Sequence, residues 1–205
     1  MMSRLLLALA CSGWICTVSC TAGPRPQPDP TRSRRLTAYS FIEEGKLIIL
    51  VVNVEAARYR AGEKYIPLLV AVGNRGIREP LQVTRESFYL VGPEGQRTGV
   101  ASTAEVIRDY HYISFDRRIL ADLGYLEAKF DFYRFMPTNF FPNPSGRNVI
   151  RDRTGIPRLT YFADLFYFPM PEGGIRERRF DLFFTDKELE DPVFVTFEIT
   201  PARAN

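Results

Sequence analysis

Cysteine and histidine are scarce in this chain. Its 205 residues include three cysteines, all within the first 20 residues, and one histidine, His111. A folded body without cysteine cannot use disulfides, so it must be stable through its own hydrophobic core. Ser-His and Cys-His nucleophilic systems would all depend on His111, and transition metals lack their usual ligands. We therefore expect no cofactor and no metal site.

The chain also lacks a strong charge imbalance and a long hydrophobic run. There are 27 basic and 24 acidic residues; loss of the first 20 residues would remove only Arg4, so 26 basic residues would face 24 acidic ones. A formal charge of +2 argues against a nucleic-acid partner, which needs a concentrated basic face. The apolar run at residues 5–10 is shorter than the roughly 20 residues that span a bilayer.

The first 20 residues have the layout of an export signal. Arg4 provides a positive start, the apolar run follows, and small residues lead into Cys20. Residues 17–20, Thr-Val-Ser-Cys, resemble the lipobox of bacterial lipoproteins, in which the cysteine becomes the first residue of the mature chain and carries lipid. The resemblance implies a signal peptide at 1–20 and lipidation of Cys20. The alternative is an ordinary secreted protein cleaved near Ala22.

Residues 21–35 predict an extended tether. Prolines at positions 24, 26, 28 and 30 alternate with other residues. This spacing removes backbone donors and favours polyproline II, at about 3.1 Å per residue. Fifteen such residues would reach about 40 Å, which would hold a folded domain clear of lipid headgroups.

From Leu36 the pattern becomes that of β-strands. Residues 47–52 form a continuous apolar run typical of a strand covered on both faces, and we expect it to be central. Pro67 cannot donate to a ladder, so its part of the next strand should lie near an edge or a bulge. Alternation or turn spacing predicts the strands at residues 64–74, 87–91, 159–168, 178–184 and 193–199.

These strands predict an all-β fold, an immunoglobulin-like two-layer β-sandwich at residues 36–200 with a C-terminal tail at 201–205. A short helical insertion interrupts it in the middle of the chain. Ser102 and Glu105 are spaced as a capping box, and residues 114–123 followed by Gly124 predict a second short helix. Residues 185–188 are also spaced as a capping box over one helical turn.

One part of this pattern is similar to a known group of proteins. Residues 65–76, Tyr-Ile-Pro-Leu-Leu-Val-Ala-Val-Gly-Asn-Arg-Gly, precede Ser-Phe-Tyr-Leu at 87–90 and a Gly-Pro-Glu-Gly turn. This strand, loop and strand resemble those of uncharacterised bacterial lipoproteins with immunoglobulin-like domains. The resemblance covers about a third of the chain. It implies the fold and adds no catalytic residue.

Aromatic residues gather between positions 125 and 141. We expect Phe130, Phe132 and Tyr133 to form a strand against the core. Phe140 and Phe141 lie between prolines in a predicted loop at 139–148, so one of them is predicted to belong to an exposed apolar patch that docks a partner. Arg134 and Arg147 would form its polar rim. The competing interpretation is that both phenylalanines cap the open end of the sandwich.

Three functional hypotheses follow. The first is a lipid-anchored, non-enzymatic binding or assembly module of the bacterial cell envelope, attached to the membrane by its N-terminal lipid, with an envelope protein or polymer as partner. The second is an accessory lipoprotein of a secretion or envelope-assembly machine, and the remote third is a hydrolase using His111. Thr21 follows the cysteine in place of aspartate, which is compatible with the outer membrane facing the periplasm; the alternative is a secreted or soluble periplasmic protein.

Overall fold

The computed structural model describes residues 33–143, 149–176 and 178–202. Its strands form three sheets, with the orders β1-β2-β3-β4-β10-β8, β12-β11-β6-β7 and β5-β9. The elements of the first sheet are β1 (Arg34–Arg35), β2 (Ser40–Glu44), β3 (Ile48–Asn53), β4 (Tyr65–Asn74), β8 (Arg134–Phe135) and β10 (Thr160–Pro169). The other two contain β6 (Phe88–Val91), β7 (Arg97–Gly99), β11 (Arg178–Phe184), β12 (Val193–Ile199), β5 (Leu81–Thr84) and β9 (Arg153–Ile156). The helices are α1 (Thr103–Asp109), α2 (Ile113–Ile119), α3 (Gly124–Lys129) and the 3-10 turns η1 (Ala56–Tyr59) and η2 (Arg85–Ser87).

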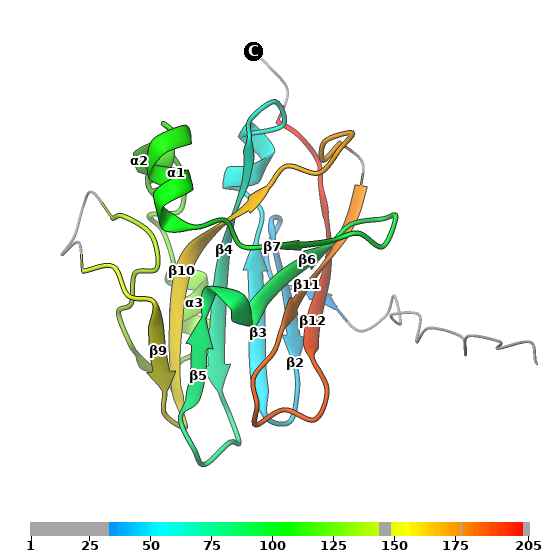
Figure 1. The fold of residues 1–205 in the computed structure, drawn as a ribbon. Coiled ribbons are helices and arrows are strands. Elements are labelled where there is room, and N and C mark those ends of the chain that lie inside the picture. Colours follow the sequence, from blue (N-terminus) through cyan, green and yellow to red (C-terminus); the bar gives the residue numbers. More distant parts are fainter. Residues whose placement is uncertain (1–32, 144–148, 177, 203–205) are drawn as a thin grey trace, which may run out of the picture.

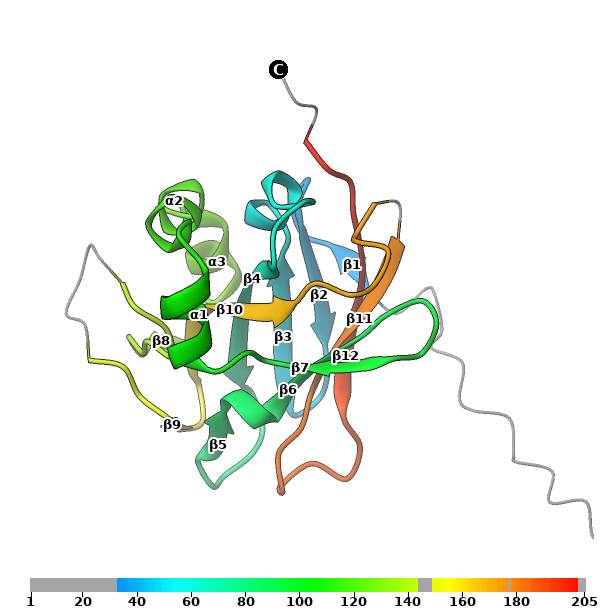
Figure 2. The ribbon, with the colours of Figure 1, turned by 45° about the horizontal axis from the view of Figure 1, so that its top comes forward.

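The two larger sheets lie against each other. β12 contacts β2 and β3 of the six-stranded sheet, and β6 and β11 lie in front of that sheet in Figure 1, which Figure 2 shows turned by 45°. Buried side chains of both sheets belong to one hydrophobic core. The expected all-β class is confirmed, because strands dominate and the helices are short.

The central strands are buried along their whole length. Every residue of β3 and β4 is buried. The apolar run at 47–52 predicts this for a strand covered on both faces and is confirmed for residues 48–52, whereas Leu47, just before β3, is 44% exposed. Pro67 pairs with Tyr167 of β10, while β3 pairs with β4 only as far as Leu69. Pro67 therefore has one ladder neighbour and lies at a local edge, where a missing N–H is tolerated.

The four-stranded sheet alternates between a buried and a half-exposed face. In β11 the side chains of Phe180, Leu182 and Phe184 are buried, whereas those between them are half-exposed. On the outer face Tyr89 stacks on Phe183 with ring centroids 4.8 Å apart, and Phe194 lies 5.0 Å from Phe183. Such cross-strand aromatic pairs stabilise the sheet and fix its register.

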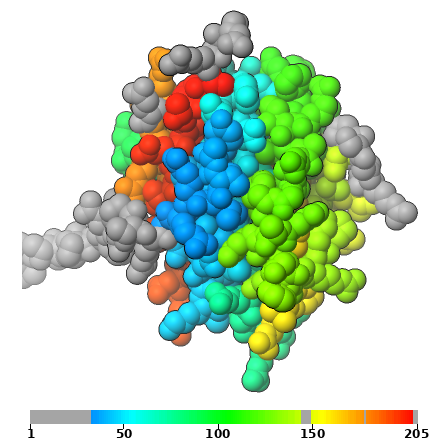
Figure 3. Space-filling model, turned by 180° about the vertical axis from the view of Figure 1, so that it is seen from behind, coloured from blue at the N-terminus to red at the C-terminus, as the bar shows by residue number. Residues whose placement is uncertain are grey.

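The predicted helical insertion is present, but its second helix has other bounds than the predicted 114–123. α1 has the expected capping box, with the Ser102 hydroxyl accepting from the Glu105 N–H. α2 ends at Ile119, and Gly124 begins α3 in place of ending α2. The helices lie beside the N-terminal strands when the molecule is seen from behind (Figure 3). Neither α2 nor α3 has a side-chain cap, which is the signal that sequence reasoning uses to place a helix start.

The predicted strand at Phe130, Phe132 and Tyr133 is wrong. These residues follow α3 in a turn, and Phe132 is 84% exposed. Phe130 is buried because it stacks on Tyr161, with ring centroids 4.3 Å apart, and lies directly over Gly73. A Cβ at position 73 would meet the Phe130 ring at 2.6 Å, so glycine is needed for this close approach.

The predicted docking role of Phe140 and Phe141 is also wrong. Both side chains are fully buried, so neither contributes to an exposed patch. Phe140 packs on Phe166 at 5.3 Å between ring centroids, and Phe141 packs on Tyr167 at 5.0 Å. Of the predicted loop at 139–148, the described part, residues 139–143, folds inward, as the competing interpretation holds.

Three smaller differences concern boundaries. Arg34 and Arg35 pair with Ile42 and Phe41, so the described end of the predicted tether belongs to the first sheet. β5 and β9 pair with each other, and neither was predicted as a strand. Residues 186–192 form turns without a helix.

The burial of the two phenylalanines predicts a large loss of stability on truncation. Phe140→Ala and Phe141→Ala should each lower the free energy of unfolding by about 3–5 kcal/mol, because each leaves a cavity in the core. The exposed Phe132→Ala is the matched control and should change it by less than about 0.5 kcal/mol. Urea unfolding followed by circular dichroism measures all three; a core variant as stable as the control would contradict the burial.

The backbone conformation of Leu159 predicts that one substitution increases stability. It has φ +56° and its side chain is 47% exposed, just before β10. Leucine is strained in the left-handed region, whereas asparagine tolerates it. Leu159→Asn should therefore raise the free energy of unfolding by about 0.5–1 kcal/mol, and Leu159→Ala, which keeps the strain, should give no such gain. Thermal unfolding of both variants, compared with the natural protein, measures these changes. If both variants are stabilised equally, the gain comes from loss of the leucine side chain and not from relief of backbone strain.

Candidate functional site: a cleft between the helices and the first sheet

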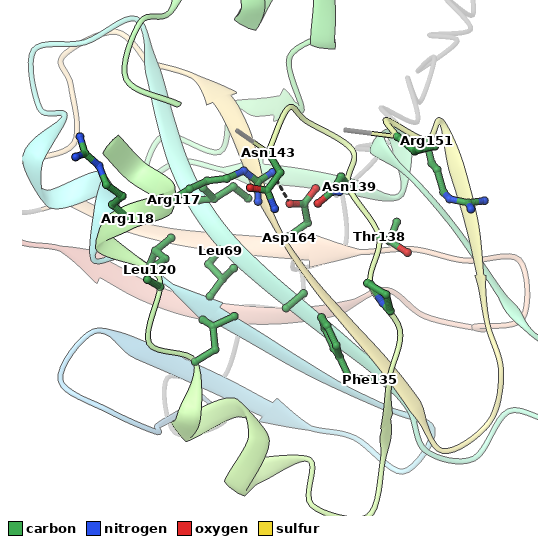
Figure 4. A pocket seen from close by; sticks show the side chains of 16 residues that line it. Leu69, Arg117, Arg118, Leu120, Phe135, Thr138, Asn139, Asn143, Arg151 and Asp164 are labelled. Carbon is green, nitrogen blue, oxygen red and sulfur yellow. Dashed lines mark hydrogen bonds and ion pairs between the residues drawn. The ribbon is translucent and has the colours of Figure 1, made fainter. Parts of the chain in front are cut away.

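A cleft of about 750 Å³ opens between the helical insertion and the edge of the six-stranded sheet (Figure 4). β4 and β10 provide one wall, the end of α2 and the α2–α3 connection a second, and residues 135–143 and 149–151 a third. The lining residues are Leu69, Arg117, Arg118, Leu120, Ala121, Leu123, Phe135, Pro137, Thr138, Asn139, Asn143, Val149, Arg151, Ala163, Asp164 and Leu165. This volume is in the range of sites that hold small molecules, roughly 300–1,000 Å³.

A buried ion pair fixes one side of the cleft. An Arg117 Nη2 lies 2.8 Å from Asp164 Oδ1, and the two side chains are 15% and 1% exposed (Figure 4). Asp164 Oδ2 accepts the Phe140 N–H at 2.6 Å. Burial raises the pKa of Asp164, while Arg117 and the Phe140 amide act in the opposite direction by stabilising its charged form.

Arg117 also positions the loop over the core. Its Nε donates to the Pro142 carbonyl at 2.8 Å and its Nη2 to the Phe141 carbonyl at 3.0 Å. One guanidinium thus joins α2, β10 and the loop that contains the two buried phenylalanines. A planar group with five donors suits this arrangement in a way that lysine does not.

Two further arginines lie at opposite ends of the cleft. Arg118 follows Arg117 on α2, and Arg151 lies in the chain leading to β9 (Figure 4). Both are exposed, and among the described residues neither forms an ion pair with an acid. The Arg118 guanidinium lies 4.8 Å from the centre of the Phe115 ring. The cleft therefore has positive charge at both ends.

A second buried cluster fixes α2 from the other side. An Asp116 Oδ1 lies 2.8 Å from Arg60 Nη2, and Asp116 Oδ2 accepts from the Tyr110 hydroxyl at 2.6 Å. Asp116 is fully buried, and burial raises its pKa from 3.8 to about 6 against the pull of Tyr110 and Arg60. Burial beside this carboxylate also raises the pKa of Tyr110. The cluster anchors α2 to the residue after η1.

The sequence-predicted site residues are not brought together. Arg134 is exposed in β8, one residue before Phe135 of the cleft, whereas Phe140 and Phe141 are in the core. Arg147 and Cys20 lie outside the described residues. Of the predicted docking residues that the structure describes, only Arg134 is at a surface near the cleft.

His111 is exposed after α1, and the two aspartates that sequence reasoning placed near it have other partners. Asp109 accepts from Arg108 and Lys64, which hold the pKa of its carboxyl well below the usual range. Asp116 is committed to Arg60 and Tyr110. Neither carboxylate is therefore available to orient an imidazole in the manner of a catalytic triad.

Sequence reasoning missed the residues that shape the cleft. One signal was present: Asp164 is the single charged residue in the otherwise apolar run of β10, and a buried charge requires a partner. That partner, Arg117, is 47 positions away, and nothing in the local pattern identifies it.

The raised pKa of Asp116 predicts a measurable pH dependence. Between pH 4 and 6 the folded state holds more protons on this group than the unfolded state does, so the free energy of unfolding falls as pH rises through that window. The stability advantage of the natural chain over Asp116→Asn should shrink by about 3 kcal/mol from pH 4 to pH 8. Urea unfolding of both proteins across this range measures the difference; an advantage that grows with pH would mean that Arg60 outweighs burial.

Known proteins share little sequence with this chain. No family model matches the chain, and no curated protein matches it. Within the described residues, no helix has the length and apolar character needed to cross a membrane. Among solved structures, a candidate lipoprotein (ycdA) of Bacillus subtilis is similar at a TM-score of 0.36 and 9% sequence identity, over 82% of this chain and 38% of that chain.

Proposed function

We propose that the protein is a lipid-anchored, non-enzymatic binding module of the bacterial cell envelope. The observation that carries this proposal is the N-terminal sequence, in which an export signal ends at Cys20 and a proline-alternating segment follows. No cysteine occurs after it, so the chain that follows Cys20 contains no disulfide partner for it. A lone cysteine at a cleavage site is suited to be an acyl acceptor.

The body of this module is an immunoglobulin-like sandwich. The order β12-β11-β6-β7 corresponds to strands G, F, C and C′ of such domains, and β3, β4 and β10 stand where A, B and E stand. The helical insertion then lies between C′ and E. Two features depart from the standard pattern: β8 runs parallel to β10 in the place of strand D, and β1 and β2 extend the opposite edge.

The binding site is the cleft. β1 and β8 are the two outermost strands of the same sheet, five strand spacings apart. At about 4.8 Å per spacing this separates the edges by about 24 Å. A chain held at the membrane through residues before β1 would present the cleft on the side away from its attachment. Its natural partner is a component of the envelope, and its location is the outer membrane facing the periplasm.

Non-enzymatic binding also agrees with the environment of His111. The imidazole is exposed, and the carboxylates of Asp109 and Asp116 are bound by cations and a tyrosine elsewhere. The cleft contains one carboxylate, Asp164, which is buried and paired with Arg117. These contacts favour binding over proton transfer.

Lipidation is the direct test of the anchor. In a bacterium that expresses the full chain, the natural protein should partition into membranes and its mass should show covalent acyl groups. Cys20→Ala should lose both properties completely, because no other residue takes the position of the acceptor. Cys16→Ala is the matched control and should remain acylated. Acyl mass and membrane partitioning that persist in Cys20→Ala would overturn the proposal.

A further inference from the structure

The charge of the cleft indicates the sign of its ligand. Its lining contains three arginines, Arg117, Arg118 and Arg151, and one acid, Asp164. Asp164 neutralises Arg117 in the buried pair, so two positive charges remain. Both belong to exposed side chains at the rim of the cleft, and Figure 4 shows their guanidinium groups extending outward from it. An anion gains from this field, whereas a cation would be repelled.

The walls between the two arginines are mainly apolar. Side chains from the sheet, the α2–α3 connection and the chain around β8 provide them, namely Leu69, Leu120, Leu123, Phe135, Val149 and Leu165. Phe135 and Val149 are 47% and 60% exposed, so a ligand that covers them would remove apolar surface from water. The ligand should therefore combine an apolar body with its negative charge.

Three backbone N–H groups around the cleft already have acceptors within the chain. The Met136 N–H donates to Tyr161, the Arg151 N–H to Asn139, and the Phe140 N–H to Asp164. Peptides that add to a sheet edge depend on free main-chain donors and acceptors. These three N–H groups are not available to a peptide strand, whereas an apolar chain or ring does not need them.

We infer that the cleft binds an anionic amphiphile, a molecule with an apolar chain or ring that carries a carboxylate, phosphate or sulfonate. The apolar body lies between Leu69 and Phe135, and the anionic group contacts Arg118 or Arg151. This inference rests on the proposed binding role of the cleft and specifies the ligand class.

The test uses residues 21–205, which contain every residue of the hydrophobic core. Two fluorescent probes form a matched pair: 8-anilinonaphthalene-1-sulfonate and the neutral N-phenyl-1-naphthylamine share the same arylamine and differ by the sulfonate. The anionic probe should bind saturably and at least about tenfold more tightly at low salt, and the preference should fall as salt increases. Laurate and dodecyl phosphate should displace it, whereas inorganic phosphate should not.

Variants locate the site. At least one of the two variants Arg118→Gln and Arg151→Gln should weaken binding of the anionic probe by about fivefold, and both should leave the neutral probe unchanged. Arg78→Gln is the matched control, because it removes the same charge from an exposed loop outside the cleft and should leave binding unchanged. Ala121→Trp places a large side chain at an exposed position of the lining and should abolish binding of both probes without lowering the unfolding temperature.

Equal affinity for the two probes would overturn the inference, and so would equal effects of the three arginine variants. Crosslinking of the lipidated chain in cells distinguishes a wrong ligand class from a wrong binding role for the cleft. If Ala121→Trp lowers crosslinking to an envelope partner while neither laurate nor dodecyl phosphate displaces the anionic probe, the cleft is a binding site and the amphiphile is the wrong ligand class. Membrane attachment through Cys20 is measured independently of both results.

Discussion

Two oppositely charged neighbours on α2 must both be paired in the interior. Asp116 is bound by Arg60 and Tyr110, and Arg117 by Asp164 together with two loop carbonyls. A buried charge without a partner costs several kcal/mol, so α2 can adopt only an orientation that satisfies both. Tertiary contacts therefore fix the position of this short, uncapped helix, because its own sequence does not.

The cleft is a consequence of this constraint. Because Arg117 holds the chain at Phe141 and Pro142, this part of the loop is fixed over the core, and the cleft lies beside it. The same helix orientation leaves Arg118 at the rim with no acidic partner among the described residues. The two adjacent arginines therefore differ in role. Arg117 is neutralised by Asp164 and fixes the structure, whereas Arg118 is available to a ligand.

The parts of the fold that could be predicted are those with local causes. The apolar run at 47–52 predicts a strand buried on both faces, and Ser102 with Glu105 predicts the start of α1, because both signals depend on neighbouring residues. Phe140 and Phe141 could not be placed in this way. Two adjacent phenylalanines in a loop have no fixed direction until distant groups, here Asp164 and Arg117, bind the backbone around them.

By itself the sequence determined the all-β class, the central strand and the absence of cysteine after Cys20, because these follow from composition and from side-chain periodicity along a strand. Tertiary structure alone decided the orientation of α2, the burial of the loop phenylalanines, and the cleft between the helical insertion and the edge of the six-stranded sheet. The partners in each of these contacts are far apart in the chain: Arg60 and Asp116 are separated by 56 residues, and Arg117 and Asp164 by 47. Such pairs form only because the fold brings them together, and burial then makes the pairing obligatory.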